Sequence, residues 1–321
     1  GVYLARASAH GNSGFPLDDA WIHQVYARNL GTRSEFSFFA GQLSAGSTAP
    51  LWTILLALGY LVRIEFHAWT YIVGALLMGA SAILAGRLAG KLFQVSGFKF
   101  QVPLFALSLS LFTLLEWHLA WSAVSGMEIP LFVFLSLLLL ERFYAGAHPA
   151  WLGLLGGLLT LTRLEGAVFA GLIGLAILFQ PQRAQRRREK SLDADERGQT
   201  RINNVSLRGA NFATKQPLHR TQVQLSPNSS TAIASLPAVA RNDMGWQGAL
   251  VRVLFSFVLG YALLITPYLL FNLAVSGNIF PNTLYAKGAE YQILLERTPF
   301  MVRYLQLLFV PFIGAQLLLA P

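Results

Sequence analysis

The chain contains no cysteine among its 321 residues, and only 12% of these residues are charged. The missing cysteines exclude disulfide bonds, catalysis by a thiolate and metal sites with cysteine ligands. The scarcity of charge argues against an ordinary soluble domain, in which about 25% of residues are charged. Hydrophobic residues instead make up 54% of the chain, and the mean hydropathy is +0.50. This composition predicts an all-α, polytopic transmembrane helical bundle.

Apolar segments follow one another along most of the chain. A helix needs about 20 predominantly apolar residues to cross a bilayer. The segments near this length occupy 50–64, 69–93, 102–122, 129–145, 150–180, 247–275 and 299–320. Because the sequence starts at Gly1 without a methionine and stops at Pro321 just after an apolar run, we expect it to be truncated at both ends.

Residues 181–246 form a hydrophilic stretch between two of these segments. The stretch holds 11 Lys and Arg residues against 5 Asp and Glu residues, and it is rich in Ser, Asn and Gln. Such a composition cannot bury a core, so a disordered loop is predicted. Most of the chain's net charge of +9 lies here. The preference of Lys and Arg for the cytoplasmic side of a membrane explains this charge without a nucleic-acid partner.

The basic residues also predict the orientation of the apolar segments. The stretch "RAQRRREK" at 183–190 marks the hydrophilic loop as cytoplasmic, and Arg87, Lys91 and Lys99 mark the end of 69–93 in the same way. The N-terminal residues 1–48 then lie outside.

The direction of each remaining segment follows from the sides assigned to these loops. Segment 102–122 runs outward and 129–145 returns, so 150–180 has to leave and come back to reach the cytoplasmic loop. Its middle, "LTRLEG" at 161–166, carries two charges and a glycine, which is where a break between two short helices is expected. By the same count, 50–64 is a juxtamembrane or re-entrant helix.

The resulting organisation places most polar clusters on the outer face. The predicted parts are an extracytoplasmic loop with juxtamembrane helices and an acidic pair (1–48), a transmembrane bundle (49–180), the cytoplasmic loop (181–246), and a second part of the bundle (247–321) with an outer loop at 276–298.

The acidic pair is the first candidate for chemistry. Asp18 and Asp19 follow Pro16 at the start of a helical pattern, where acidic residues also stabilise a helix by offsetting its dipole. A carboxylate beside the membrane can alternatively act as a general base on an acceptor hydroxyl. His23 lies on the same helical face as Asp19, and it either orients that carboxylate or lies on the surface. A divalent metal bound by these three residues is not indicated, because no second group of ligands accompanies them.

Three further charged motifs fall on the predicted outer face. "SGME" ends with Glu128, and "TRLEG" contains Arg163 and Glu165, which either form a salt bridge at the helix break or bind an anionic headgroup. Lys287 in "NTLYAKG" is either an interfacial lysine or a phosphate ligand.

In this order, the motifs resemble those of the C-type superfamily of membrane glycosyltransferases. The similarity is greatest to its arabinofuranosyltransferase-like and protein-mannosyltransferase-like branch. The matching stretches are "DDAWIHQVYARNL" (18–30), "AGSTAPLW" (45–52), "SGMEIPLF" (125–132), "TRLEG" (162–166) and "FPNTLYAK" (280–287). Leu164 replaces a proline of the family pattern, and Ile129 replaces a threonine. The family's first transmembrane helix does not precede the acidic pair, and 181–246 resembles an insertion.

The resemblance implies an inverting transfer of sugar at the outer face of a bacterial-type plasma membrane. The donor would be a polyprenyl-phosphate-linked sugar, and the acceptor a hydroxyl of a glycan, lipid or protein. Asp18 or Asp19 would be the general base, and Arg163 and Lys287 would hold the departing phosphate. Glu128, Glu165, His23, Asn282 and Tyr285 are further candidates for substrate binding, and no cofactor is expected.

Two other classes of protein remain compatible with the sequence. A multi-span transporter or lipid-carrier flippase would also gather charges within a membrane bundle, although it would be expected to place them at several depths. A catalytically inactive scaffold would keep the fold without the reaction.

Overall fold

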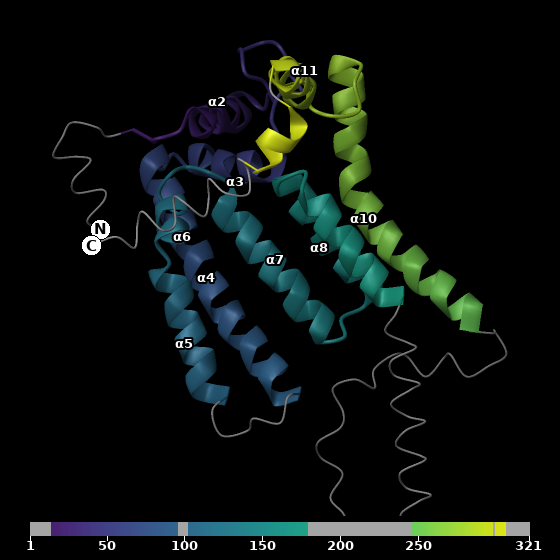
Figure 1. The fold of residues 1–321 in the computed structure, drawn as a ribbon. Coiled ribbons are helices and arrows are strands. Elements are labelled where there is room, and N and C mark those ends of the chain that lie inside the picture. The colour runs from purple at the N-terminus through teal and green to yellow at the C-terminus, as the bar shows by residue number, and fades with distance from the viewer. Residues whose placement is uncertain (1–13, 96–101, 179–245, 298, 306–321) are drawn as a thin grey trace, which may run out of the picture.

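The computed structural model describes residues 14–95, 102–178, 246–297 and 299–305 (Figure 1). Over these residues the chain is helical and contains no strand. The labelled helices are α2 (Asp18–Arg33), α3 (Pro50–Leu61), α4 (Phe66–Val95), α5 (Val102–Leu115), α6 (Trp117–Ser122), α7 (Ile129–Tyr144), α8 (Pro149–Thr162), α10 (Trp246–Ser276) and α11 (Asn282–Arg297). A further helix, Gly166–Leu178, follows α8.

Helices α4, α5, α7, α8 and α10 form a bundle, and further helices lie at one end of it. Figure 1 shows α2, α3 and α11 gathered at this end, which we call the upper end of the bundle. The lower end contains the turn from α7 to α8 and the start of α10. The helices that carry the acidic pair and Lys287 therefore lie at the same end of the molecule.

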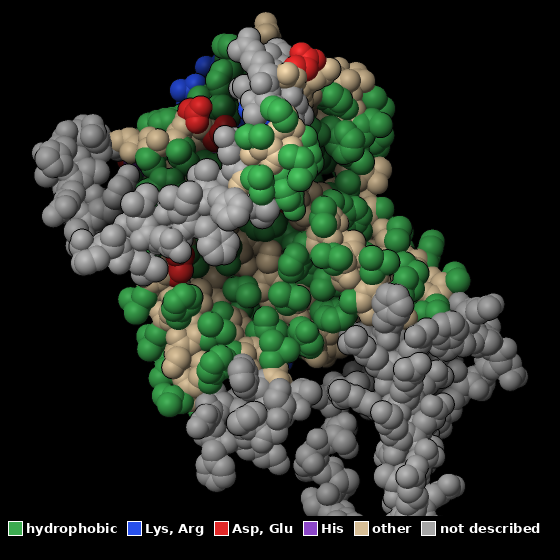
Figure 2. Space-filling view, viewed as in Figure 1, with side chains coloured by type: hydrophobic (Ala, Val, Ile, Leu, Met, Phe, Trp, Pro, Cys, Tyr) green, Lys and Arg blue, Asp and Glu red, His purple; other side chains and the backbone are tan. Residues whose placement is uncertain are grey.

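Two helices have the length and apolar composition needed to cross a membrane. They are Phe66–Leu92, within α4, and Leu250–Ser276, within α10, each 27 residues long. Shorter apolar helices accompany them, and many of their large apolar side chains are exposed, including Leu104 on α5 and Leu263 on α10. Figure 2 shows hydrophobic side chains over the flank of the bundle, whereas Asp, Glu, Lys and Arg are sparse there. Exposed apolar surface of this extent indicates contact with lipid or with another apolar surface.

Helices α8 and α10 pack closely because glycines lie between them. A Cβ atom on Gly153 of α8 would lie 2.0 Å from the carbonyl oxygen of Phe257 on α10. A Cβ atom on Gly260 would lie 2.1 Å from the carbonyl oxygen of Ala150. Small residues at such contacts allow backbones to approach, as they commonly do in membrane bundles. Helix α10, which corresponds to the predicted transmembrane segment 247–275, therefore packs against α8.

The predicted break in 150–180 is confirmed. Helix α8 ends at Thr162, Arg163 is extended with φ −154° and ψ 142°, and the next helix begins at Gly166. The two helices form a hairpin in which Gly156 approaches Ala170. Arg163 and Glu165 therefore lie in a turn at the upper end of the bundle.

Two predicted boundaries were wrong. The outer loop at 276–298 contains a helix, α11, which begins directly after Pro281, a residue suited to a helix start. Segment 102–122 is broken into α5 and α6 at Glu116, whose side chain accepts hydrogen bonds from the backbone N–H groups of His118 and Leu119 and so caps the new helix. The predictions for 1–13, for 181–245 and for 306–320 lie outside the described residues.

Candidate functional site

The acidic pair occupies the first turn of α2. Asp18 is exposed and Asp19 is half-buried. The backbone N–H of Asp19 donates to Oδ1 of Asp18 at 2.9 Å, while the N-cap residue, Leu17, makes no side-chain cap. Among the described residues, no ion pair involves either aspartate. Both carboxylates thus stabilise α2 by offsetting its dipole, and neither of the two residues is buried.

His23 lies one turn further along α2, but its charged neighbour is not Asp19. The residue is only 3% exposed, so the expectation of a surface histidine was wrong. Its Nε2 lies 3.3 Å from Oε2 of Glu128, which belongs to the "SGME" motif. This contact ties the helix of the acidic pair to the start of α7.

Glu128 is the N-cap residue of α7 and is 4% exposed. The turn before it depends on Gly126, which has a φ of +82° and on which a Cβ atom would lie 2.9 Å from Cβ of Ala20. Glycine adopts such a φ without strain and leaves room for α2. Burial raises the pKa of the Glu128 carboxyl, but contacts with His23 and Arg163 outweigh it and hold the pKa below its ordinary value. Glu128 is therefore a buried carboxylate kept ionised by its neighbours.

Arg163 joins this carboxylate to the helix break. Its Nη1 donates to Oε1 of Glu128 at 2.6 Å, and its Nη2 donates to Oε1 of Glu165 at 3.0 Å. The predicted salt bridge between Arg163 and Glu165 is therefore present, together with a second one to Glu128. Burial raises the pKa of Glu165, but the hydrogen bond and positive charge of Arg163, with a local backbone hydrogen bond, together outweigh it and lower that pKa. The guanidinium remains partly exposed, which leaves it accessible to an anion.

A different set of contacts joins the "AGSTAPLW" and "FPNTLYAK" motifs. The backbone N–H of Asn282 donates to the carbonyl of Ala45 at 2.9 Å. The hydroxyl of Thr283 donates to the carbonyl of Gly46 at 3.1 Å. Trp52, almost fully buried, donates from Nε1 to the carbonyl of Gly126 at 3.0 Å and so connects this set to "SGME". All five motifs are thus linked by direct contacts at the upper end.

Trp52 and Tyr268 take part in these links, although neither was singled out from the sequence. The hydroxyl of Tyr268 on α10 donates to the carbonyl of Ser47 at 2.8 Å. The position of Trp52 within "AGSTAPLW" was the available signal for its role. Tyr268 lies in an apolar run and carries no such signal.

Lys287, Tyr285 and Asn282 lie on α11, and all three are exposed. Asn282 is at the start of the helix, where its Oδ1 accepts from Nδ2 of Asn278 at 3.4 Å. No contact among the described residues joins Lys287 to Arg163 or to the acidic pair. Ion pairs therefore join Arg163, Glu165, Glu128 and His23, and none among the described residues extends this chain to Lys287.

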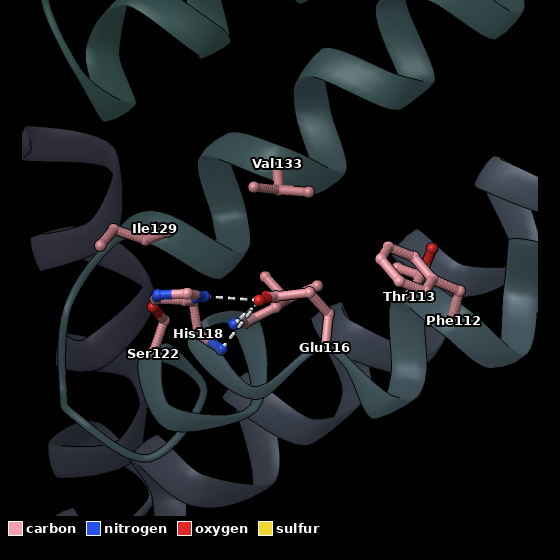
Figure 3. A pocket seen from close by; sticks show the side chains of 8 residues that line it. Phe112, Thr113, Glu116, His118, Ser122, Ile129 and Val133 are labelled. Carbon is pink, nitrogen blue, oxygen red and sulfur yellow. Dashed lines mark hydrogen bonds and ion pairs between the residues drawn. The ribbon is translucent and has the colours of Figure 1, made fainter. Parts of the chain in front are cut away.

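A hollow of about 300 Å³ lies between α5, α6 and α7 and is lined by both apolar and polar side chains (Figure 3). Glu116 and His118 lie at it, with Nδ1 of His118 2.6 Å from Oε1 of Glu116. Sequence reasoning did not identify this pair, although a glutamate two residues before a histidine at the end of an apolar run was a usable signal. Among the described residues, no hydrogen bond or ion pair joins the pair to the five motifs, although Ile129 of "SGMEIPLF" lines the same hollow.

The described residues contain no group of three or more His, Asp or Glu side chains arranged to hold a metal ion. The candidate site consists of the acidic pair, of which Asp18 is exposed and Asp19 half-buried, and an ion-pair chain of His23, Glu128, Arg163 and Glu165. A comparison of the chain with models of known protein families, with curated proteins and with solved structures finds no match.

Proposed function

We propose that the protein is an integral-membrane glycosyltransferase that moves a sugar from a polyprenyl-phosphate donor to an acceptor hydroxyl at the outer face of the membrane. The observation that carries the proposal is the linkage of the five motifs at one end of the bundle. His23 contacts Glu128, Glu128 contacts Arg163, and Trp52 contacts Gly126. Residues far apart in the sequence thus lie in contact, which supports a shared function.

The proposed orientation puts the upper end of the bundle outside and the lower end in the cytoplasm. Arg87 and Lys91 lie toward the end of α4, and the basic stretch 183–190 follows helix Gly166–Leu178. The preference of Lys and Arg for the cytoplasmic side favours this orientation. A donor with its prenyl chain in the lipid would then present its phosphate and sugar to the upper end.

The acidic pair supplies the base in the proposed reaction. The carboxylate of Asp18 or Asp19 accepts the proton of the acceptor hydroxyl, and the resulting oxygen nucleophile bonds to the anomeric carbon. The bond from that carbon to the phosphate oxygen breaks at the same time, and polyprenyl phosphate leaves with the bonding electrons. This direct displacement inverts the anomeric configuration, with an oxocarbenium-like transition state.

Arg163 stabilises the departing phosphate in this scheme. Its guanidinium has two partners, of which Glu165 has a side chain 66% exposed and Glu128 one only 6% exposed. A phosphate replaces the exposed partner more readily, because Glu165 is hydrated when displaced, whereas Glu128 would lose its partner inside the protein. Arg163 would then keep Glu128 while binding the donor. Lys287 is proposed as a second, more distant cation.

The test is sugar transfer from polyprenyl-phosphate donors in membranes that contain the full-length protein. We expect D18N or D19N to lower turnover by about 10² to 10⁴, the usual contribution of a general base. E35Q is a matched control, since Glu35 is a carboxylate just after α2 whose Oε2 accepts from the local N–H of Gly41 and, within the described part of the chain, takes part in no ion pair. Full turnover in both aspartate variants would remove the acidic pair from catalysis. Bilayer passage of the lipid carrier without sugar transfer would instead indicate a flippase.

A further inference from the structure

Three arginines lie at the upper end of the bundle, where the last turns of α2 and α3 touch. A Cβ atom on Gly31 of α2 would lie 3.4 Å from the backbone nitrogen of Leu61 on α3, so the two backbones are in contact there. Arg28 and Arg33 flank Gly31, and Arg63 comes just after Leu61. All three arginines are exposed, and Figure 2 shows Lys and Arg side chains at this end.

Within the described part of the chain, none of these arginines takes part in an ion pair. Two carboxylates lie close in sequence, Glu35 just after Arg33 and Glu65 just after Arg63, but both are engaged elsewhere. The Oε2 atoms of Glu35 and Glu65 accept hydrogen bonds from local backbone N–H groups at 2.9 and 2.8 Å. The guanidinium groups are therefore available to an anion from outside the chain.

Arg63 has a backbone conformation that glycine usually provides. Its φ is +60°, and the N–H groups of Arg63 and Ile64 donate to the carbonyls of Tyr60 and Gly59 at 3.2 and 2.9 Å. This arrangement is the Schellman motif, in which the residue after the C-cap is usually glycine because a side chain there is strained. Strain of this kind is found where the residue has a function. An arginine at this position therefore indicates a use for its guanidinium.

The neighbours of Arg63 are apolar and exposed. Leu61, Val62 and Ile64 are 66%, 58% and 39% exposed. Their turn directly precedes Phe66–Leu92, one of the two helices long and apolar enough to cross a membrane. In a membrane the turn therefore lies beside the lipid headgroups, where apolar side chains reach the acyl chains and an arginine reaches phosphate.

We propose that Arg28, Arg33 and Arg63 bind the phosphate of an anionic phospholipid in the leaflet at the upper end of the bundle. Guanidinium groups bind phosphate oxygens through paired N–H donors. The exposed apolar residues of the turn contact the acyl chains of the same lipid, which a free phosphate lacks. The three arginines take no part in the ion-pair chain of Glu128 and Arg163, so this proposal does not depend on the proposed function.

The experiment uses the full chain in phosphatidylcholine nanodiscs. Because the chain contains no cysteine, Val62→Cys can be labelled with bimane without removing a native residue. Phosphatidylglycerol or phosphatidylcholine, each with a nitroxide high on the acyl chain, is included at equal mole fraction, and quenching of the label measures the local concentration of each lipid. We expect phosphatidylglycerol to be enriched over phosphatidylcholine by about five-fold, the preference that one arginine near a charged membrane surface provides.

Two variants in the labelled background test the arginines. R28Q/R33Q/R63Q should remove the enrichment, whereas a label on Tyr144→Cys, an exposed position at the end of α7, should report the same quenching with and without these substitutions. R63G is the second variant, because glycine suits the φ of this position and preserves the turn. It should lower the enrichment by about two-fold or more, and it should unfold at a temperature at least as high as the unaltered chain.

Equal quenching by the two lipids in the unaltered chain, or an enrichment that persists in R28Q/R33Q/R63Q, would overturn the proposal. A lower unfolding temperature in R63G with an unchanged enrichment would show that Arg63 only offsets the dipole of α3. Loss of the enrichment in inorganic phosphate, but not in sodium chloride of equal ionic strength, would assign the site to free phosphate and overturn its assignment to a lipid.

Discussion

Helix α7 has a buried glutamate near each end, and the two make different ion pairs. At the upper end, Glu128 (6% exposed side chain) pairs with Arg163 (35%) and with His23. At the lower end, Glu141 (9%) pairs with Lys91 (39%) on α4 and with the neighbouring Arg142.

Burial and partner exposure are thus alike at both ends, but the balance of charge is opposite. The lower carboxylate faces two cations, whereas the upper guanidinium faces two carboxylates. The comparison teaches that a buried ion pair alone does not identify a site. The position of the upper pair beside the acidic pair, and its link to a buried histidine, distinguish it from the lower one.

The largest expected difference between the two ends is in catalysis. R163Q should lower sugar transfer by about 10² to 10³, the usual loss when one group that stabilises developing negative charge is removed. K91Q should leave turnover within about three-fold of the unaltered protein, since surface charges distant from a reaction contribute little to it. Initial rates measured at equal amounts of inserted protein check both variants. Equal losses in R163Q and K91Q would show that both pairs act through stability alone.

Removal of the lower cation should instead affect stability. K91A leaves the buried Glu141 with Arg142 as its remaining ion-pair partner. We expect a loss of about 1 to 3 kcal/mol, less than for a fully buried pair because Lys91 is 39% exposed. Thermal unfolding in detergent, with the conservative K91R as the control, measures this loss. An unchanged unfolding temperature in K91A would mean that Arg142 alone is enough to balance the charge of Glu141.

Acid should weaken the upper end. The pKa of Glu128 is lowered in the folded protein, so the stability it contributes is present above the ordinary glutamate value of 4.5 and is lost as the pH falls through the lower, folded value. Thermal unfolding followed from about pH 6 to pH 3 should therefore show a decline that is smaller in E128Q. An identical decline in both proteins would assign acid sensitivity to other carboxylates.

The smallest effects are expected from the exposed second partners. Glu165 at the upper end and Arg142 at the lower end have side chains 66% and 48% exposed. E165Q and R142Q should each change the free energy of unfolding by less than about 1 kcal/mol, as is usual for exposed ion pairs. Chemical denaturation of the two variants side by side tests this. A large loss in E165Q would indicate that it holds the helix break together.

The sequence was informative where local chemistry decides the structure. Two charges and a glycine at 162–166 correctly predicted the break between α8 and the next helix, because such residues are unfavourable inside an apolar helix. The sequence predicted an outer loop at 276–298 and no helix at 282–297, whereas the structure contains one there. Pro281 directly precedes α11 and Asn282 begins it. Both residue types are common at helix starts as well as in loops, so their presence alone does not distinguish the two.

The partners that a side chain contacts in the folded protein could not be predicted from its neighbours in the sequence. Helical spacing paired His23 with Asp19, its neighbour one turn away, whereas the folded chain pairs it with Glu128. The five motifs could be found in order, but no pattern in them specifies that Trp52 reaches Gly126 or that Asn282 reaches Ala45. Those pairings depend on how the helices pack, which hydrophobic periodicity does not encode.

The shortness of α8 determines how deep its charged turn would lie. Its 14 residues span about 21 Å, whereas the 31 residues of α10 span about 46 Å. The hydrocarbon layer of a bilayer is about 30 Å thick. In a membrane, α8 would therefore fall short of spanning the hydrocarbon layer. Lipid beside the Arg163 turn would have to thin, and a ligand anchored by its own hydrocarbon chain could reach the turn from the side.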